Sequence, residues 1–223
     1  PKVAAVFLRP KTKSSPEDFS RAIVKYLHDY GYLWRAFKKC AFEYAEKSSA
    51  PEIKSEELEI LLRPEKPPRK VDVASYVFPP RILIESLTEW LHSKGNMDHD
   101  VIKLLVETYM STPPNFFDKY RKLRRDPIEE SFKSIITFLH SFGIYSYVFI
   151  DQFEYVIEPL STSRLAEFCN EMRRLLEVSA GKVTYIVSLH SEAHGRIARD
   201  QGCGYFRSIA NPDTLRKIPD LER

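Results

Sequence analysis

The run Ile144-Tyr145-Ser146-Tyr147-Val148-Phe149-Ile150, followed by Asp151, decides the fold class of this chain. Its residues are rich in β-branched and aromatic side chains and end at an acid, which predicts a buried central strand. Two more apolar runs lie at 3–8 (Val3-Ala4-Ala5-Val6-Phe7-Leu8) and at 183–189. The continuous pattern of 3–8 is typical of a strand that is buried on both faces of a sheet.

Helical patterns separate these three runs. Ser15-Pro16-Glu17-Asp18 has the marks of a helix start: a Ser cap, Pro at the first helical position and acids in the first turn. Asp126-Pro127-Ile128-Glu129 is a second start, in which Glu129 can reach back to the cap. The other predicted helices cover 33–45, two stretches between 81 and 110, 163–178, 192–200 and a short segment at 212–217. Strands that alternate with helices in this order predict an α/β fold with a parallel sheet.

This order divides the chain into four segments. Residues 1–47 hold the first strand and helices of the α/β core, and residues 48–80 form a Pro-rich linker or surface excursion. Residues 81–142 form a helical layer. Residues 143–223 return to the α/β core with the other two strands and their helices.

Composition excludes two broad classes of protein. Hydrophobic residues make up 43% of the 223 residues and charged residues 29%, which suits neither a disordered chain nor a membrane protein. No run approaches the roughly 18–20 apolar residues of a membrane helix, so no membrane partner is expected. The net charge of +3 is too small to imply nucleic-acid binding by itself. The three cysteines, Cys40, Cys169 and Cys203, are odd in number and far apart, which predicts free thiols in a reducing, cytoplasmic compartment.

The glycines supply none of the usual phosphate-binding loops. The chain has 7 of them, and none opens a Gly-x-x-x-x-Gly-Lys-Ser/Thr loop or a Gly-x-Gly-x-x-Gly turn. The sequence also begins at Pro1, without Met, directly before an apolar run. We therefore expect it to be a piece of a longer protein.

Asp151 is the most informative candidate residue. It places a carboxylate at the carboxyl end of a predicted buried strand, where open α/β sheets bind ligands. In a nucleotide site such a carboxylate holds Mg²⁺, usually through a water molecule. The alternative is a structural role, in which Asp151 caps the next turn.

The chain resembles the AAA+ and related P-loop ATPases, in particular the prokaryotic origin-recognition-like and phage-defence types. Three segments carry the resemblance by their order and spacing: Ile150-Asp151-Gln152-Phe153-Glu154, the helix at 165–176, and Ile186-Val187-Ser188-Leu189-His190-Ser191-Glu192. The resemblance implies a parallel sheet of P-loop NTPase type with an inserted helical layer, and a phosphate-binding loop upstream of Pro1. It also implies ATP and Mg²⁺ as cofactors.

The same resemblance assigns roles to individual residues. Asp151 would bind Mg²⁺, and Gln152 and Glu154 would lie by the attacking water. His190 or Ser191, or less favourably Ser188, would sense the γ-phosphate; for Ser191 the alternative is an ordinary helix cap. An arginine acting in trans would be one of Arg207, Arg216 and Arg223, among which the sequence does not choose.

One departure from the family bears on catalysis. Gln152 stands where the family usually has Glu, and a neutral amide positions a water without taking its proton. Glu154 would point to the same face of an extended strand as Gln152, so it replaces the missing base only if the chain turns there. The sequence therefore predicts a protein that binds Mg-ATP and hydrolyses it weakly or not at all. Whether it is an ATPase stays open at this point.

Two further patterns have their own hypotheses. His190 and His194 have the i, i+4 spacing of a zinc pair, but the intervening Glu192 is misplaced for a zinc protease and no third ligand is evident. Lys119, Arg121, Lys122, Arg124 and Arg125 form a cluster that suits the phosphates of DNA or RNA, or simply a solvated face. The second functional hypothesis is therefore a non-catalytic, degenerate ATPase-like module that binds nucleic acid or a protein partner. Self-association is a further expectation from the family.

Overall fold

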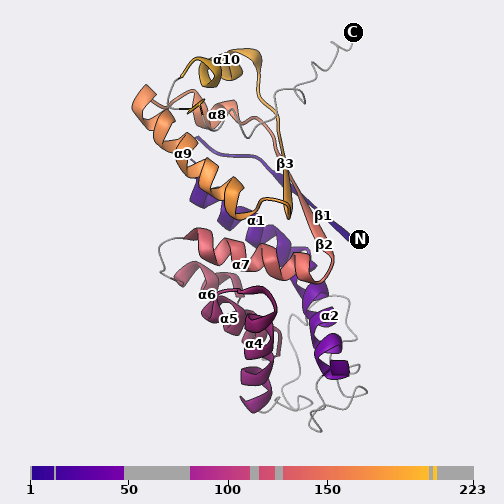
Figure 1. Ribbon diagram of the computed structural model, residues 1–223. Coiled ribbons are helices and arrows are strands. Elements are labelled where there is room, and N and C mark those ends of the chain that lie inside the picture. The colour runs from indigo at the N-terminus through magenta and orange to yellow at the C-terminus, as the bar shows by residue number, and fades with distance from the viewer. Residues whose placement is uncertain are drawn as a thin grey trace.

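The computed structural model describes residues 2–12, 14–47, 81–110, 116–123, 128–200 and 203–204 (Figure 1). The elements in chain order are β1 (Lys2–Leu8), α1 (Pro16–Asp29), α2 (Tyr32–Lys47), α4 (Arg81–Gly95), α5 (His99–Met110), α6 (Phe116–Lys122), α7 (Ile128–Ser141), β2 (Ile144–Ile150), α8 (Glu154–Ile157), α9 (Thr162–Val178), β3 (Val183–Val187) and α10 (Ser191–Arg199). The predicted segments 48–80 and 212–217 lie outside the described residues.

The three strands form one parallel sheet in the order β1-β2-β3, with β2 in the centre. The register aligns Phe7 with Phe149, and Phe149 with Ile186, across the sheet. The predictions of a parallel sheet, of an α/β fold and of a central strand at 144–150 are therefore confirmed. The expectation that this strand is buried is only half right, because its alternate residues Tyr145 and Tyr147 are 40% and 38% exposed. The third strand ends at Val187, two residues earlier than predicted, because Ser188 and Leu189 begin the turn into α10.

The start of α1 follows the sequence pattern closely. The Ser15 hydroxyl accepts a hydrogen bond from the Asp18 backbone N–H at 3.2 Å, and the Asp18 carboxylate accepts one from the Ser15 backbone N–H at 2.8 Å. This reciprocal capping box satisfies two N–H groups that have no partner within the helix. The second predicted start lies just before α7, and its residues 126 and 127 are outside the described ranges.

The helices cover one face of the sheet. Helix α1 contacts β1, α7 contacts β2, and α1, α7 and α9 contact one another (Figure 1). Helices α2, α4, α5 and α6 pack around the far sides of α1 and α7. The core between sheet and helices contains fully buried apolar side chains, among them Val6, Ile23, Leu27, Ile135, Leu139 and Val148.

The opposite face of the sheet does not match the sequence prediction. We expected β1 to be buried on both faces, but Val3 is 52% exposed and Phe7 is 63% exposed. The expectation is wrong because only the alternate residues Ala4 and Val6 are buried, in the core that includes residues of α1 and α7. A continuous apolar run shows only that neither face is polar; it does not show that both faces are covered.

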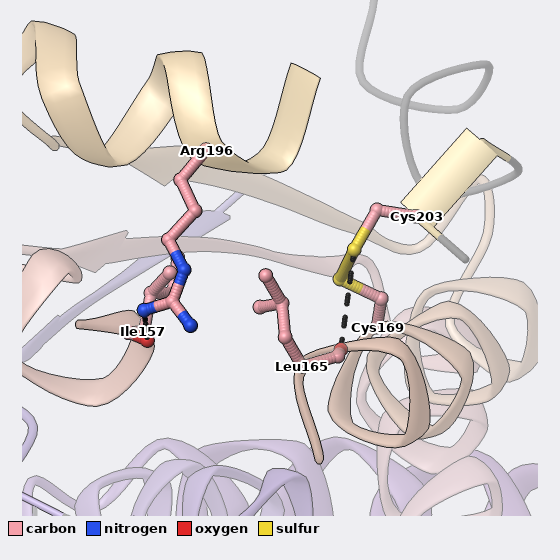
Figure 2. The surroundings of a disulfide bond; sticks show 5 residues. All are labelled: Ile157, Leu165, Cys169, Arg196 and Cys203. Atoms are coloured by element: carbon pink, nitrogen blue, oxygen red, sulfur yellow. Dashed lines mark hydrogen bonds between the residues drawn. A yellow bond between two sulfur atoms is a disulfide. The ribbon is translucent and has the colours of Figure 1, made fainter. Parts of the chain in front are cut away.

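The cysteines also differ from the prediction. Cys169 in α9 and Cys203 after α10 form a disulfide, with their Cα atoms 5.5 Å apart (Figure 2). Only Cys40 is free, and it is buried in α2. The prediction of three free thiols is wrong because the turn from β3 through α10 brings residues 34 positions apart side by side. The inference of a reducing, cytoplasmic compartment therefore loses this support.

Membrane crossing requires a helix that is both long and apolar. Within the described ranges, no helix combines that length with that composition.

Candidate functional site

The carboxyl ends of the three parallel strands bring together side chains that are far apart in sequence. Arg9 follows β1, Asp151 follows β2, and Ser188 follows β3. Backbone hydrogen bonds extend the sheet by one step at this edge: Asp151 donates to the Leu8 carbonyl at 3.0 Å, and Ser188 donates to the Ile150 carbonyl at 2.9 Å. The sheet therefore sets the backbone positions of Asp151 and Ser188 at this edge.

Asp151 is held from both sides. The Ser188 hydroxyl donates a hydrogen bond to Oδ1 of Asp151 at 2.8 Å, and Nε of Arg9 lies 3.5 Å from Oδ2. The side chain of Asp151 is 49% exposed and that of Arg9 is 80% exposed. An ion pair this exposed is worth about 0–1 kcal/mol, so a cation can displace Arg9 at little cost. Oδ2 is the oxygen that is available to a ligand.

Gln152 adopts a backbone conformation that is unusual for its type. Its φ of 58° lies in the left-handed region, which costs a residue with a side chain about 1 kcal/mol or more. Its backbone N–H donates to Oγ of Ser188 at 3.2 Å, so that hydroxyl joins Gln152 to Asp151. Phe153 also donates from its backbone to the Ser188 carbonyl at 3.1 Å. Ser188 therefore stabilises the turn after Asp151, because its hydroxyl and its carbonyl accept hydrogen bonds from the two residues that follow Asp151.

This turn changes the position of Glu154. In an extended strand Gln152 and Glu154 would share a face, but the left-handed Gln152 ends the strand and Glu154 begins α8. The chain therefore turns here, which is the condition that the sequence set for Glu154 to replace the missing base. Oε2 of Glu154 is shielded from solvent and has no hydrogen-bond partner within the described part of the chain. A buried acceptor without a donor costs free energy, so Oε2 retains its capacity to accept a hydrogen bond.

His190 faces a different partner. Its Nδ1 caps α10 by accepting from the Ala193 backbone N–H at 3.4 Å, which leaves the proton on Nε2. Nε2 lies 2.7 Å from Oε1 of Glu158, to which it donates. The structure thus brings His190 to Glu158, not to Asp151. Ser191 begins α10 and is exposed.

Arg196 was not predicted from the sequence as a site residue, and in the structure its side chain binds three backbone carbonyls. Its guanidinium donates to the carbonyl of Ile157 at 2.8 Å (Figure 2), to that of Glu158 at 2.7 Å, and also to that of Leu160. These carbonyls end α8 and begin the turn toward α9, where helical partners are missing. Arg196 thereby fixes α10 to the segment that follows Asp151. No local pattern marks such a contact, because its partners are backbone atoms some 36–39 residues away.

The remaining sequence candidates are not part of this edge. His194 lies in α10 and is exposed. Among the described residues, no group of three or more His, Cys, Asp or Glu side chains is arranged to hold a metal ion. Lys119 and Lys122 are exposed on α6. The side chain of Arg121, and Arg124, Arg125, Arg207, Arg216 and Arg223, lie outside the described residues.

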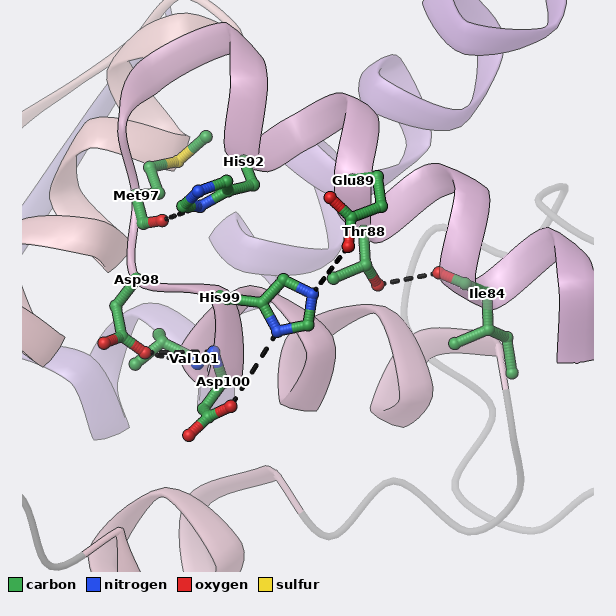
Figure 3. Close-up of polar contacts among 9 residues, drawn as sticks. All are labelled: Ile84, Thr88, Glu89, His92, Met97, Asp98, His99, Asp100 and Val101. Atoms are coloured by element: carbon green, nitrogen blue, oxygen red, sulfur yellow. Dashed lines mark hydrogen bonds and ion pairs between the residues drawn. The ribbon is translucent and has the colours of Figure 1, made fainter.

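A second polar cluster joins α4 to α5 (Figure 3). His92 Nδ1 lies 2.5 Å from the Met97 carbonyl, and Asp98 Oδ1 caps α5 by accepting from the backbone N–H of Asp100 and Val101 at 3.0 and 3.1 Å. His99 Nε2 lies 3.1 Å from Oε1 of Glu89. Each polar group here closes a turn or bridges the two helices, so the cluster has a structural role.

Comparison with known proteins adds no match. Neither a protein-family model, nor a curated protein, nor a solved structure matches this chain.

Proposed function

We propose that this chain is part of the nucleotide-binding core of an AAA+-like ATPase and binds Mg-ATP with weak or no hydrolysis. One observation carries the proposal: Asp151 stands at the carboxyl edge of the central parallel strand, with Ser188 orienting one carboxylate oxygen and the other oxygen accessible. Ligands of open α/β sheets bind at this edge.

The chemistry of Mg²⁺ suits a single carboxylate. The ion keeps several waters and takes phosphate oxygens from the nucleotide, so one or two protein oxygens complete its shell. In this proposal Oδ2 of Asp151 holds the ion, directly or through a water, after Arg9 has moved aside. The Ser188 hydroxyl keeps Oδ1 in place.

Weak or absent hydrolysis follows from the residues after Asp151. Gln152 has no proton-accepting side chain, and its backbone N–H is already used by Ser188. Glu154 is the remaining base, but it lies in α8 with one oxygen buried. A sensor role for His190 requires it to leave Glu158.

The test is nucleotide affinity of the polypeptide as its own cell makes it. Fluorescent N-methylanthraniloyl-ATP is titrated with Mg²⁺ and with EDTA, for the wild type and for Asp151→Asn. We expect Asp151→Asn to weaken the Mg²⁺-dependent affinity at least tenfold and to leave the EDTA value unchanged. Asp118→Asn, at an exposed carboxylate of α6, is the matched control. Equal affinities in the two variants, or no binding by the wild type, would contradict the proposal.

A second candidate function is nucleic-acid binding through α6. Lys119 and Lys122 are both exposed and are spaced three residues apart, which puts them on one face of the helix. Such a pair suits two backbone phosphates. Binding of this kind weakens steeply with salt, and replacing each lysine reduces that salt dependence. A binding isotherm for single- and double-stranded DNA at several salt concentrations tests it.

A further inference from the structure

The ion pair between Arg9 and Asp151 joins the ends of two neighbouring strands. Arg9 directly follows β1, and the backbone N–H of Asp151 donates to the Leu8 carbonyl at 3.0 Å, which holds the two residues side by side. Nε of Arg9 lies 3.5 Å from Oδ2 of Asp151. Within the described ranges, Arg9 is the one cation that pairs with this carboxylate. The negative charge of Asp151 is therefore balanced by one exposed side chain.

A structural role explains this pair poorly. Exposed ion pairs contribute little to stability, and the Arg9 side chain makes no other hydrogen bond or ion pair with the described part of the chain. The contact on the other side of Asp151 is different, because the Ser188 hydroxyl donates to Oδ1 at 2.8 Å and also supports the following turn. Asp151 thus has one firmly held oxygen, Oδ1, and one loosely held oxygen, Oδ2.

Oδ2 is also the oxygen that the proposed function assigns to Mg²⁺. Arg9 and a divalent cation therefore compete for the same atom, because their positive charges repel each other at such short range. An exposed ion pair is weak, so this competition lowers the affinity for a bare cation by about fivefold at most. Arg9 thus disfavours a metal ion that arrives without a nucleotide.

A displaced Arg9 is suited to bind a phosphate. Its guanidinium has N–H donors in a planar fork that matches phosphate oxygens, and it stays charged. Oxygens that share one Mg²⁺ lie within about 4 Å of each other, because each is about 2.1 Å from the ion. A phosphate oxygen on an ion at Oδ2 is therefore within reach of a side chain that already contacts Oδ2. The 80% exposure of Arg9 leaves its side chain room to turn.

We propose that Arg9 selects the Mg²⁺ complex of a nucleoside triphosphate over the bare ion. It pairs with Oδ2 of Asp151 as the structure shows, competes there with a bare divalent cation, and moves to a phosphate oxygen when ion and phosphate arrive together. Two contacts between opposite charges then replace one, and neither Arg9 nor Asp151 is left unpaired. This inference rests on the nucleotide binding proposed above and adds a residue to that site.

Lys11 provides a matched control two residues along the chain. It is exposed and carries the same charge as Arg9, and its turn is closed by two hydrogen bonds: its N–H donates to Oγ of Ser14 at 3.0 Å, and its carbonyl accepts from the Ser14 N–H at 3.0 Å. Neither bond uses the lysine side chain. Replacing Lys11 therefore removes a positive charge from the same loop and keeps the pair between Arg9 and Asp151. A general effect of positive charge would move both variants alike.

The test measures affinity for the bare ion and for the nucleotide complex, in the polypeptide as its own cell makes it. Mn²⁺ replaces Mg²⁺ in the first measurement, because its electron paramagnetic resonance signal falls on binding. Mg²⁺ with N-methylanthraniloyl-ATP is used in the second. For Arg9→Gln we expect the Kd of Mn²⁺ alone to fall by about two- to fivefold and the Kd of the nucleotide complex to rise about tenfold or more. For Lys11→Gln we expect both Kd values to stay close to those of the wild type.

Opposite shifts of the two Kd values distinguish this role from a structural one. In the Asp151→Asn background, Arg9→Gln should no longer tighten Mn²⁺ binding, because the competition needs the carboxylate. Shifts in the same direction, no shift, or equal shifts in Arg9→Gln and Lys11→Gln would overturn the inference.

The same measurements separate this inference from the proposed function. If Asp151→Asn loses Mg²⁺-dependent affinity while Arg9→Gln binds the nucleotide complex like the wild type, only the role of Arg9 is wrong. If the wild type does not bind the nucleotide complex, or Asp151→Asn binds it equally well, the proposed function and the role of Arg9 are both wrong.

Discussion

The hydroxyl of Ser188 donates a 2.8 Å hydrogen bond to Oδ1 of Asp151 and accepts one from the backbone N–H of Gln152. One side chain at the end of β3 thus orients the carboxylate at the end of β2 and stabilises the turn that follows it. In a nucleotide site a hydroxyl at this position fixes the direction of the metal-binding oxygen. The same contact would serve a purely structural turn, so the two roles need separate measurements.

Replacing Ser188 with Ala removes both hydrogen bonds. We expect the free energy of unfolding to fall by about 1 kcal/mol, because the Gln152 N–H loses its partner at a partly exposed site. If Asp151 binds Mg²⁺, the Mg²⁺-dependent affinity for ATP falls as well, by several-fold. Urea denaturation and nucleotide titration separate the two effects, with Ser163→Ala, at an exposed serine of α9, as the control. An unchanged affinity alongside lower stability would indicate that Ser188 has only a structural role.

Replacing Gln152 with Gly relieves the left-handed backbone. Glycine adopts a positive φ without steric cost, so we expect Gln152→Gly to raise the free energy of unfolding by about 0.5–1 kcal/mol. Glu192→Gly in α10 is the control, since the same loss of a side chain inside a helix destabilises by about 1 kcal/mol. Denaturant unfolding measures both. If Gln152→Gly lowered the free energy of unfolding as much as Glu192→Gly, the prediction would be wrong. The amide side chain of Gln152 would then stabilise the fold by more than the left-handed backbone costs.

The disulfide between Cys169 and Cys203 predicts a definite thiol count. Unfolding without reductant should expose one thiol to alkylation, that of Cys40, whereas unfolding with reductant should expose all three. Closing a loop between residues 34 apart stabilises by about 2–4 kcal/mol. Cys203→Ser should therefore lower stability by about this amount under oxidising conditions and by much less under reducing ones. Three reactive thiols in the oxidised protein would contradict the pairing.

His28 makes stability depend on pH. Burial lowers the pKa of His28, and its Nδ1 lies 3.0 Å from the hydroxyl of Tyr109, whose own pKa is raised by burial. Because the folded pKa is below the unfolded value of 6.5, the unfolded state binds more protons between the two values. The stabilisation is complete above about pH 6.5 and is lost as pH falls through the folded pKa. Thermal unfolding from pH 7.5 to 5 should therefore show a falling Tm, with a flatter profile in His28→Gln.

Several elements could be predicted from neighbouring residues alone. The strand at 144–150 is marked by its run of β-branched and aromatic residues, and α1 by a capping box whose partners are three residues apart. Asp151 could be placed at the end of a strand because the apolar run at 144–150 predicts the strand and the acid directly after it marks where the strand ends. The position of Glu154 could not, because it depends on a left-handed turn at Gln152 that Ser188 supports from another strand.

The sequence by itself determined the order of the strands and the longer helices, the capped start of α1 and the carboxylate after the central strand, since these rest on interactions within a few residues. The short helices α6 and α8 were not predicted. The tertiary structure alone decided that Ser188 and Arg9 meet Asp151, that Cys169 pairs with Cys203, and that alternate residues of the strands, among them Val3 and Phe7, are exposed. Those outcomes depend on strand register and on the side of the sheet to which each crossover returns. Both are set by packing between segments distant in the chain, which no local pattern encodes.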